Sequence, residues 1–263
     1  MSVAAATSLP PALQMRGVAV GSARDARVAV VEDVNWTVAV GEFWVVGAPQ
    51  HSGKSDFLMV TGGLASPVRG DYCFLGERMP IFEELRLGHR LKLGFVFDGG
   101  QLISPLTVAE NVALPLRYHG NLAPAAIEAR VTALLELTGL TPWAHQPPGH
   151  LGRSWQQRVG LARALALQPE VLLLDSPLTG LDVRHAMWWL DFLDHLSHGH
   201  RYLAGRPVTL VVTADDLRPW RRHAHRVACL IARRLRVLGD WSAADACGEA
   251  VVRELLPKAP AGD

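Results

Sequence analysis

Cysteine and long apolar runs are scarce in this sequence, and each scarcity argues against a class of protein. The three cysteines, Cys73, Cys229 and Cys247, are odd in number and form no CxxC pair, which argues against a disulfide framework and against a zinc site. Apolar runs such as VLLL and CLIA are far shorter than the roughly 20 residues that a membrane-spanning helix needs. The N-terminal residues lack the pattern of a secretory signal. We therefore expect a cytoplasmic protein that reaches a membrane only through a partner.

Positive and negative charges are nearly balanced, with 26 basic and 25 acidic residues and a net charge of +1. No long-range field therefore favours nucleic acid, and no nucleic-acid partner is expected. One local exception is a group of C-terminal arginines: Arg218, Arg221, Arg222, Arg226, Arg233, Arg234 and Arg236. They form either a patch for nucleic acid or anionic lipid, or a solvated charged face, and we favour the solvated face.

Apolar segments of strand length alternate with helical patterns, which predicts an α/β fold with a mainly parallel sheet. The clearest strands are FWVV before Gly47, LGFVF ending at Phe97, VLLLD ending at Asp175 and TLVVT ending at Thr213. In open parallel sheets, ligands gather at the carboxyl ends of the strands. The segment from about 100 to 167 predicts a separate helical lobe, and the segment from Val227 predicts a hairpin followed by a helix. We expect one domain over residues 13–252, with flexible ends at 1–12 and 253–263.

A candidate phosphate-binding loop follows the first of these strands. It comprises Gly47, Ala48, Pro49, Gln50, His51, Ser52, Gly53, Lys54, Ser55 and Asp56. Its end matches the pattern GxxxxGK[ST], in which backbone N–H groups surround a phosphate, the lysine reaches the outer phosphates and the hydroxyl binds Mg²⁺. Ala48 stands where the pattern has its first glycine, so its Cβ is expected to weaken the loop. His51 stands where the general pattern accepts any residue.

The tripeptide GKS alone is also compatible with a surface turn. Its position between a strand and a helix is the context that the motif requires, and the helix adds its positive N-terminal end. Lysine is rare, since Lys54, Lys92 and Lys258 are the only three, so background usage does not account for Lys54. Asp175 is either a strand-end cap or a Mg²⁺ ligand acting through water, and the loop upstream favours the ligand.

The order of these segments resembles the ATP-binding cassette of ABC transporters over about residues 13–252. QQRVGLARALALQPEVLLLD resembles the end of that family's signature segment, and LTGLD around Asp182 resembles its D-loop. FVFDGGQLISPLTVAENVALPL is similar to the segment where such cassettes enter their helical lobe, and it looks most like the cassettes of bacterial lipid and organic-solvent transport. The resemblance implies a P-loop NTPase core with an antiparallel β portion and a helical lobe, and it implies ATP and Mg²⁺ as cofactors.

Several positions depart from the family's pattern. The Q-loop glutamine falls at Asp98, the carboxylate after the Walker B aspartate at Ser176, and the switch histidine at Ala214. A serine with an ordinary pKa is a poor general base, and alanine offers no polar group. The resemblance implies Ser55, Asp175 and Asp98 as metal ligands. No catalytic residue is therefore expected to be intact, and the aromatic that stacks on adenine in many cassettes is absent near Val20.

The family's signature LSGGQ reads LGRSW here, at Leu151, Gly152, Arg153, Ser154 and Trp155. Cassettes of this family work as head-to-tail dimers in which each ATP lies between one subunit's phosphate loop and the other's signature. Arg153 is bulky at the closest approach to the phosphate. The loss of two charge-assisted hydrogen bonds of about 1.5–3 kcal/mol each predicts that a homodimer does not close. The opposing interpretation is that Arg153 itself binds the γ-phosphate bidentately.

The resemblance implies a peripheral subunit on the inner face of the cell membrane. Its implied partners are a membrane-spanning permease subunit and a second cassette, in a homodimer or a heterodimer. We predict Mg-ATP binding with weak or absent hydrolysis. Loss of one catalytic group commonly lowers the rate of phosphoryl transfer by a factor of about 10³–10⁵. A non-transport, nucleotide-responsive scaffold is one alternative. Another is an active ATPase that uses Asp98, Asp215 or Asp216 as a substitute carboxylate. A DNA-repair or translation cassette is disfavoured, because neither a coiled-coil insertion nor a second cassette fits in this length.

Overall fold

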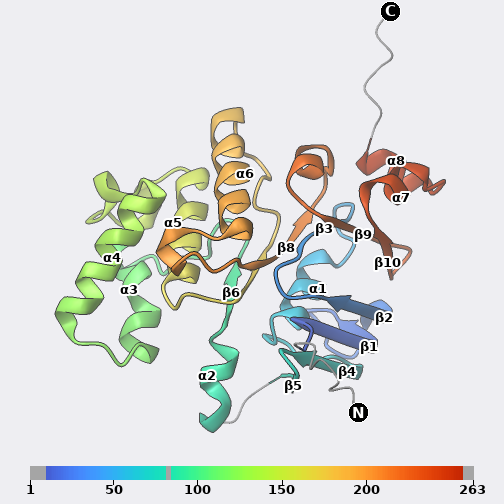
Figure 1. Cartoon of the computed structure of the whole chain (residues 1–263), viewed down its shortest axis with the longest axis horizontal. Coiled ribbons are helices and arrows are strands. Elements are labelled where there is room, and N and C mark those ends of the chain that lie inside the picture. Colours follow the sequence, from blue (N-terminus) through green and yellow to red (C-terminus); the bar gives the residue numbers. More distant parts are fainter. Residues whose placement is uncertain (1–9, 81–83, 257–263) are drawn as a thin grey trace, which may run out of the picture.

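The computed structural model describes residues 10–80 and 84–256 of the 263-residue chain. Within these residues, the strands form one mixed sheet in the order β5-β4-β1-β2-β10-β9-β3-β8-β7-β6 (Figure 1). The strands are β1 Leu13–Gly21, β2 Ala29–Val38, β3 Phe43–Gly47, β4 Arg69–Phe74, β5 Glu77–Arg78, β6 Leu93–Val96, β7 Val171–Leu174, β8 Thr209–Ala214, β9 Arg226–Ile231 and β10 Arg234–Gly239.

The helices fall into groups along the sheet. They are α1 Lys54–Thr61, α2 Leu87–Arg90, α3 Val108–His119, α4 Pro124–Thr138, α5 Arg153–Leu165, α6 Val183–His198, α7 Trp241–Ala246 and α8 Ala250–Leu255. Figure 1 shows α3, α4 and α5 together at one end of the molecule, and α7 and α8 near the opposite end. The predicted helical lobe is therefore present, with α3, α4 and α5 as its main helices.

Strand β3 lies inside the sheet between β9 and β8, and all of its residues are buried. Phe43 and Val45 belong to the core on one face of the sheet, and Trp44 and Val46 belong to the core on the other. Successive side chains of a strand point to opposite faces, so a strand covered on both sides reads as a continuous apolar run. The same alternation holds in β7, whose residues Val171–Leu174 are all buried.

The direction of pairing changes across the sheet. Strands β9, β3, β8, β7 and β6 pair in parallel, each with the next. Strands β1, β2, β4 and β5 pair antiparallel at the other end, and β9 and β10 form the predicted hairpin. The expected α/β fold, with a mainly parallel part and an antiparallel part, is confirmed.

The expected C-terminal boundary falls inside a helix. The segment predicted as a tail from residue 253 includes the end of α8, which continues to Leu255; Leu255 is 4% exposed, and Val252 is buried. Residues 257–263 of the expected tail, and residues 1–9 of the expected flexible N-terminus, lie outside the described residues. Within 10–80 and 84–256, no helix has the length and apolar character that a bilayer crossing requires.

A close approach of two glycines places the lobe against the sheet. A Cβ on Gly160 of α5 would lie 2.8 Å from the Cα atom of Gly100, in the loop that follows β6. From the same helix, Arg163 donates hydrogen bonds to the carbonyl oxygens of Gly100 (2.7 Å) and Gln101 (3.0 Å). Helix α5 therefore holds the backbone of this loop directly, without an intervening side chain at Gly160.

Substitution Gly160→Ala tests this contact. The added methyl group is expected to lower the free energy of unfolding by about 1–3 kcal/mol, because backbone rather than a flexible side chain occupies its space. Urea denaturation provides the measurement. Gly88→Ala is the control, since a Cβ there meets nothing within 4 Å in the short helix α2, and no loss is expected. Equal stability of Gly160→Ala and the parent chain would contradict the close approach.

Candidate functional site

The parallel strands end side by side and so gather their following residues at one edge of the sheet. Gly47 at the end of β3 pairs with Ala214 of β8, and Leu174 of β7 pairs with Val212 of β8. The N–H of Ala48 donates to the carbonyl oxygen of Ala214 at 2.8 Å. This register brings the start of the phosphate loop, Asp175 and the end of β8 together, as the sequence predicted.

The phosphate loop runs from β3 into α1, whose first two residues are Lys54 and Ser55. Gly53 has φ +83°, and the N–H of Phe57 donates to its carbonyl oxygen, which begins the helix. Ser55 is exposed and Lys54 is half-buried at the helix N-terminus. An oxyanion at this end would meet the free N–H groups of the first turn and the lysine ammonium together.

The strained position of the loop is His51 rather than Ala48. Ala48 was expected to weaken the loop, but its backbone is not in the left-handed region, and its side chain is completely buried. His51 has φ +60°, a conformation that costs a side-chain-bearing residue about 1–2 kcal/mol relative to glycine. The left-handed residues of this loop, His51 and Gly53, lie three and five residues after Ala48, and the expected weakening of the loop by Ala48 stays a prediction.

Asp175 is held by a threonine that the sequence analysis did not select. Asp175 is 6% exposed, and its Oδ1 accepts a hydrogen bond from the hydroxyl of Thr213 at 2.9 Å. The same hydroxyl accepts from the N–H of Ser176 at 3.0 Å, so Thr213 joins β8 to the residues after β7. The available signal was a polar residue at the end of the apolar strand TLVVT.

The residues at this edge include oxygen donors of the kind that a divalent cation takes. Thr213 engages Oδ1 of Asp175, which leaves Oδ2 for another ligand. Asp175 Oδ2 and the Ser55 hydroxyl are hard oxygen donors of the kind that Mg²⁺ prefers, and Mg²⁺ commonly keeps waters between itself and the protein. These two residues would hold the ion, and the ion would supply charge neutralisation for phosphate oxygens.

Asp98, the third expected metal ligand, is already paired with a cation of the chain. It follows β6, and its carboxylate forms an ion pair and a hydrogen bond with the guanidinium of Arg153, the first residue of α5. The carboxylate therefore neutralises the charge of Arg153. The role of Asp98 as a metal ligand stays a prediction, since only Oδ1 of its carboxylate contacts Arg153.

Arg153 lies where three loops meet. A Cβ on Gly99 would be 3.3 Å from its Nη1 atom, and one on Gly180 would be 3.9 Å from its Nε atom. The loop after β6, the beginning of α5 and the loop before Asp182 therefore converge on one guanidinium. Two departures from the family pattern, Asp98 and Arg153, form a single contact.

The comparisons with known proteins agree with this geometry. The family model described as "ABC transporter" matches residues 31–179. The chain belongs to the ABC transporter family.

Two relatives are named as fused proteins. The macrolide export ATP-binding/permease protein MacB of Nitrosomonas europaea is 33% identical over 80% of this chain, and the pyoverdine export ATP-binding/permease protein PvdT of Pseudomonas syringae pv. tomato is 34% identical over 78%. The cassette spans only 31% of the length of each.

Solved structures share the fold. The dimeric structure of the cassette MJ0796 in a post-hydrolysis state, bound to ADP and Pi, has a TM-score of 0.75 and 28% identity and covers 85% of this chain and 96% of its own. CbiO1 of Clostridium perfringens, part of the transporter complex CbiONQ, has a TM-score of 0.72 over 88% of this chain and 89% of its own. Its 21% identity supports the fold alone.

The signature segment of this cassette faces an aromatic cluster. Trp155 contacts Trp143, with ring centroids 6.2 Å apart, and meets the His185 ring edge-on at 5.2 Å. Arg158 lies between aromatic rings, 4.7 Å from the Trp155 centroid and 3.7 Å from that of Trp188. Burial lowers the pKa of the Arg158 guanidinium to about 10, which leaves it charged at neutral pH.

The same cluster reaches the D-loop. Asp182 caps α6 by accepting from the N–H of His185 at 3.0 Å, and its other carboxylate oxygen lies 2.8 Å from His185 Nδ1. These hydrogen bonds from His185, the backbone one first, lower the pKa of Asp182. Trp155 therefore touches a residue that fixes the D-loop aspartate, which ties the signature segment to the D-loop within one chain.

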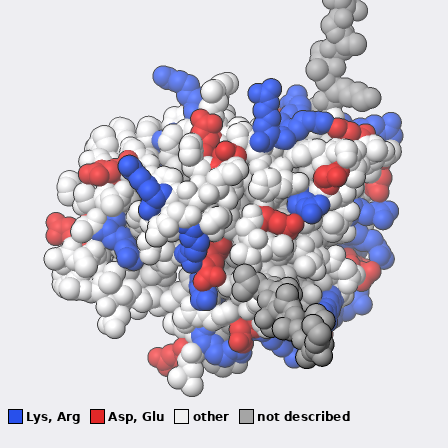
Figure 2. Space-filling view, in the orientation of Figure 1, with Lys and Arg blue, Asp and Glu red and all other residues white. Residues whose placement is uncertain are grey.

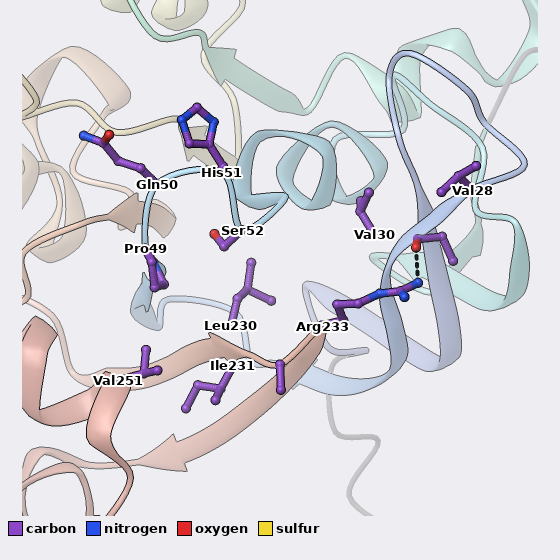
Figure 3. A pocket seen from close by; sticks show the side chains of 12 residues that line it. Val28, Val30, Pro49, Gln50, His51, Ser52, Leu230, Ile231, Arg233 and Val251 are labelled. Atoms are coloured by element: carbon purple, nitrogen blue, oxygen red, sulfur yellow. Dashed lines mark hydrogen bonds between the residues drawn. The ribbon is translucent and has the colours of Figure 1, made fainter.

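Two cavities border the phosphate loop, and Val30 and His51 line both of them. The first, of about 450 Å³, lies between the loop and the β9–β10 turn (Figure 3). In Figure 3, Ser52 lies on the side of the loop that faces Leu230, while Gln50 and His51 lie at its outer rim. The Ser52 hydroxyl is buried and has no hydrogen-bond partner among the residues that the structure describes. The second cavity, of about 410 Å³, is lined by His51 and Gly53–Asp56 together with residues after β1.

The C-terminal arginines are paired with carboxylates. Six of the seven form ion pairs: Arg218 with Asp216, Arg221 with Asp245, Arg226 with Glu42, Arg233 with Glu32, Arg234 with Asp33 and Arg236 with Glu249. In Figure 2, blue and red groups accordingly alternate over this part of the molecule. The ion pairs favour the solvated charged face over a patch of one sign. They also engage Asp216, one of the three carboxylates considered as substitutes in hydrolysis.

A double-mutant cycle tests the Asp98–Arg153 pair. Asp98→Asn, Arg153→Gln and the double variant are expected to show a coupling energy of about 0.5–1 kcal/mol in urea unfolding, because both side chains are about half exposed. The control cycle uses Asp71→Asn and Arg78→Gln, whose ion pair is more exposed, at 67% and 77%, and no coupling is expected there. Additive effects in the Asp98–Arg153 cycle would show that the contact contributes nothing.

Proposed function

We propose that this cassette binds Mg-ATP as a subunit of a membrane transport complex and hydrolyses it weakly or not at all. The observation that carries the proposal is the contrast at one sheet edge. Lys54, Ser55 and Asp175 are present for holding the nucleotide. Ser176 and Ala214, in contrast, occupy the positions of the carboxylate and the histidine that the family uses in ATP hydrolysis.

Retention of binding is supported by groups that act without a catalytic base. The loop amides and the α1 N-terminus attract phosphate oxygens, Lys54 adds a full positive charge, and Ser55 and Asp175 hold Mg²⁺. The MJ0796 cassette, of similar fold, is bound to ADP and Pi in its structure. The cost of the left-handed His51 is small compared with several such charge-assisted hydrogen bonds.

Loss of hydrolysis is supported by the surroundings of Asp175. The Ser176 side chain is 4% exposed, and its hydroxyl lies 3.4 Å from Asp175 Oδ1. A serine hydroxyl does not take a proton from water at neutral pH, so no general base stands beside the Walker B aspartate. Ala214 has no polar side chain, and Asp98 is held by Arg153. Removal of a single such element commonly lowers the rate of phosphoryl transfer by a factor of about 10³–10⁵.

A membrane partner is supported by the segment that precedes α3. Asn111, which is completely buried, accepts from the N–H of Ile103 and donates to its carbonyl oxygen, so this segment has one fixed shape. Ile103 nevertheless leaves 45% of its side chain exposed. The relatives combine cassette and permease in one chain, and for this chain a permease subunit and a second cassette, on the inner face of the membrane, are part of the proposal.

The proposed cargo is a lipid or another organic molecule. Lipid-related transport rests on the resemblance of the segment FVFDGGQLISPLTVAENVALPL to cassettes of bacterial lipid and organic-solvent transport. The relatives are named for export of a macrolide and of pyoverdine, and both names refer to organic molecules rather than to ions.

Calorimetric titration with Mg-ATP tests the binding half of the proposal. The parent chain is expected to bind, and Lys54→Ala is expected to weaken binding about tenfold or more, since a charge-assisted contact to phosphate is removed. Lys92→Ala is the matched control, because that lysine pairs with Glu170 at 3.1 Å and belongs to no part of the loop. Absence of heat and of any thermal stabilisation at saturating Mg-ATP would refute binding.

The variant Ser176→Glu tests the hydrolysis half. It restores the missing carboxylate, yet steady-state ATP turnover is expected to stay at the level of the same variant carrying Lys54→Ala, because Ala214 and Arg153 remain. Titration with Mg-ATP shows that the variant protein is folded and still binds. Turnover that rises clearly above the Lys54→Ala background would mean that the other departures matter less than proposed.

A further inference from the structure

The cavity beside α1 contains a negative charge as well as the positive charge of the phosphate loop. Its lining includes Lys54, Ser55 and Asp56, and Asp56 is the one carboxylate among the described residues that line it. Within residues 10–80 and 84–256, no ion pair joins Asp56 or Lys54 to an opposite charge. A phosphate chain bound by Lys54 and Ser55 therefore meets a carboxylate that no cation of the chain neutralises.

Asp56 stands at the end of α1 that attracts anions. It lies in the first turn of the helix, one residue beyond the Ser55 hydroxyl. The motif GxxxxGK[ST] ends at Ser55, so phosphate binding does not require an acidic residue at position 56. The free N–H groups and the dipole of a helix N-terminus attract a carboxylate as they attract phosphate oxygens. Carboxylate and phosphate thus compete for the same end of α1.

A hydrogen bond holds the Asp56 side chain in place. Its Oδ1 accepts from the N–H of Ala23, in the connection between β1 and β2, at 2.7 Å, and the residue is half-buried. The donor is a neutral backbone group, so the negative charge of the carboxylate remains. Rotation of Asp56 away from a phosphate would break this hydrogen bond. The repulsion between the two anions is therefore built into the loop.

Asp98, the other aspartate expected beside the phosphates, differs from Asp56 in this respect. The carboxylate of Asp98 has the guanidinium of Arg153 as its counter-charge, whereas Asp56 has only a backbone N–H. Electrostatic repulsion of a bound phosphate is therefore expected mainly from Asp56.

We propose that Asp56 makes this cassette selective for the Mg²⁺-bound nucleotide over the free nucleotide. This rests on the proposed nucleotide binding and adds a specificity-determining residue to the same site. The repulsion from Asp56 grows with the negative charge of the ligand. Free ATP meets this repulsion in full, and Mg-ATP meets much less of it, because the cation neutralises part of the phosphate charge. The selectivity comes in addition to the hold of Ser55 and Asp175 on the ion.

Calorimetric titration with ATP, in Mg²⁺ and in EDTA, tests this role. Asp56→Asn removes the charge and keeps an oxygen that accepts from Ala23. The variant is expected to bind free ATP about tenfold more tightly than the parent chain and Mg-ATP about threefold more tightly. Its preference for Mg-ATP over free ATP therefore falls about threefold. An unchanged preference, or free ATP bound no more tightly than by the parent chain, overturns the proposal.

Asp25→Asn is the matched control. Asp25 is exposed on the connection between β1 and β2, and it does not line the cavity. The substitution changes the net charge of the protein by the same amount as Asp56→Asn. Both affinities are expected to stay at the values of the parent chain. An equal gain in Asp25→Asn would assign the effect to net charge and not to Asp56.

Asp56→Ala separates the charge from the hydrogen bond. It removes the acceptor for Ala23 together with the charge. If the charge sets the selectivity, Asp56→Ala lowers the preference for Mg-ATP as Asp56→Asn does. A preference that falls in Asp56→Ala and not in Asp56→Asn would show that the hydrogen bond, and not the charge, is responsible.

Salt dependence gives a readout that a purely structural role would not change. The advantage of Asp56→Asn over the parent chain in binding free ATP is expected to shrink between about 0.05 M and 0.5 M NaCl, because salt screens the repulsion. Free tripolyphosphate is expected to show the same advantage, since the repulsion acts on phosphate. An advantage that is independent of salt, or that is confined to ATP, contradicts the proposal.

The outcomes distinguish this proposal from the function on which it rests. A parent chain that binds neither Mg-ATP nor free ATP refutes nucleotide binding itself. A parent chain that binds Mg-ATP, with the same preference in Asp56→Asn, leaves nucleotide binding intact and overturns the role of Asp56.

Discussion

The register of the parallel strands is the constraint on which the site depends. Pairing of Gly47 with Ala214, and of Leu174 with Val212, stops three strands at one edge of the sheet. Thr213 then reaches Asp175 and Ser176 with one hydroxyl. A shift by one residue would turn every buried side chain of β3 to the other face, so the core that fills both faces also fixes the site.

The departures from the family pattern are linked in space. Asp98 and Arg153 count as two independent losses in the sequence, but in the structure the carboxylate of one neutralises the guanidinium of the other. Either charge alone would be unfavourable. Asp98 would repel a bound phosphate, and Arg153 would have no counter-charge beside its glycine neighbours Gly99 and Gly180. In the ion pair each charge has its counter-charge.

The sequence predicted the central strands because each is apolar throughout and ends at a polar or small residue. It predicted the phosphate loop because the motif is local. The Asp98–Arg153 pair, whose members are 55 residues apart, and the Thr213–Asp175 bond could not be predicted, because they depend on how loops meet after the sheet has formed. The strain at His51 was missed for a different reason: the general motif constrains residue types but not the backbone angles between them.

The central claim is that this edge of the sheet binds ATP without hydrolysing it. The most direct measurement is to incubate the protein with Mg-ATP, separate the bound nucleotide from the free and identify it by chromatography. The account predicts that the nucleotide recovered from the protein is still ATP after many hours, and that Lys54→Ala retains much less nucleotide. Recovery of ADP from the parent chain would contradict it.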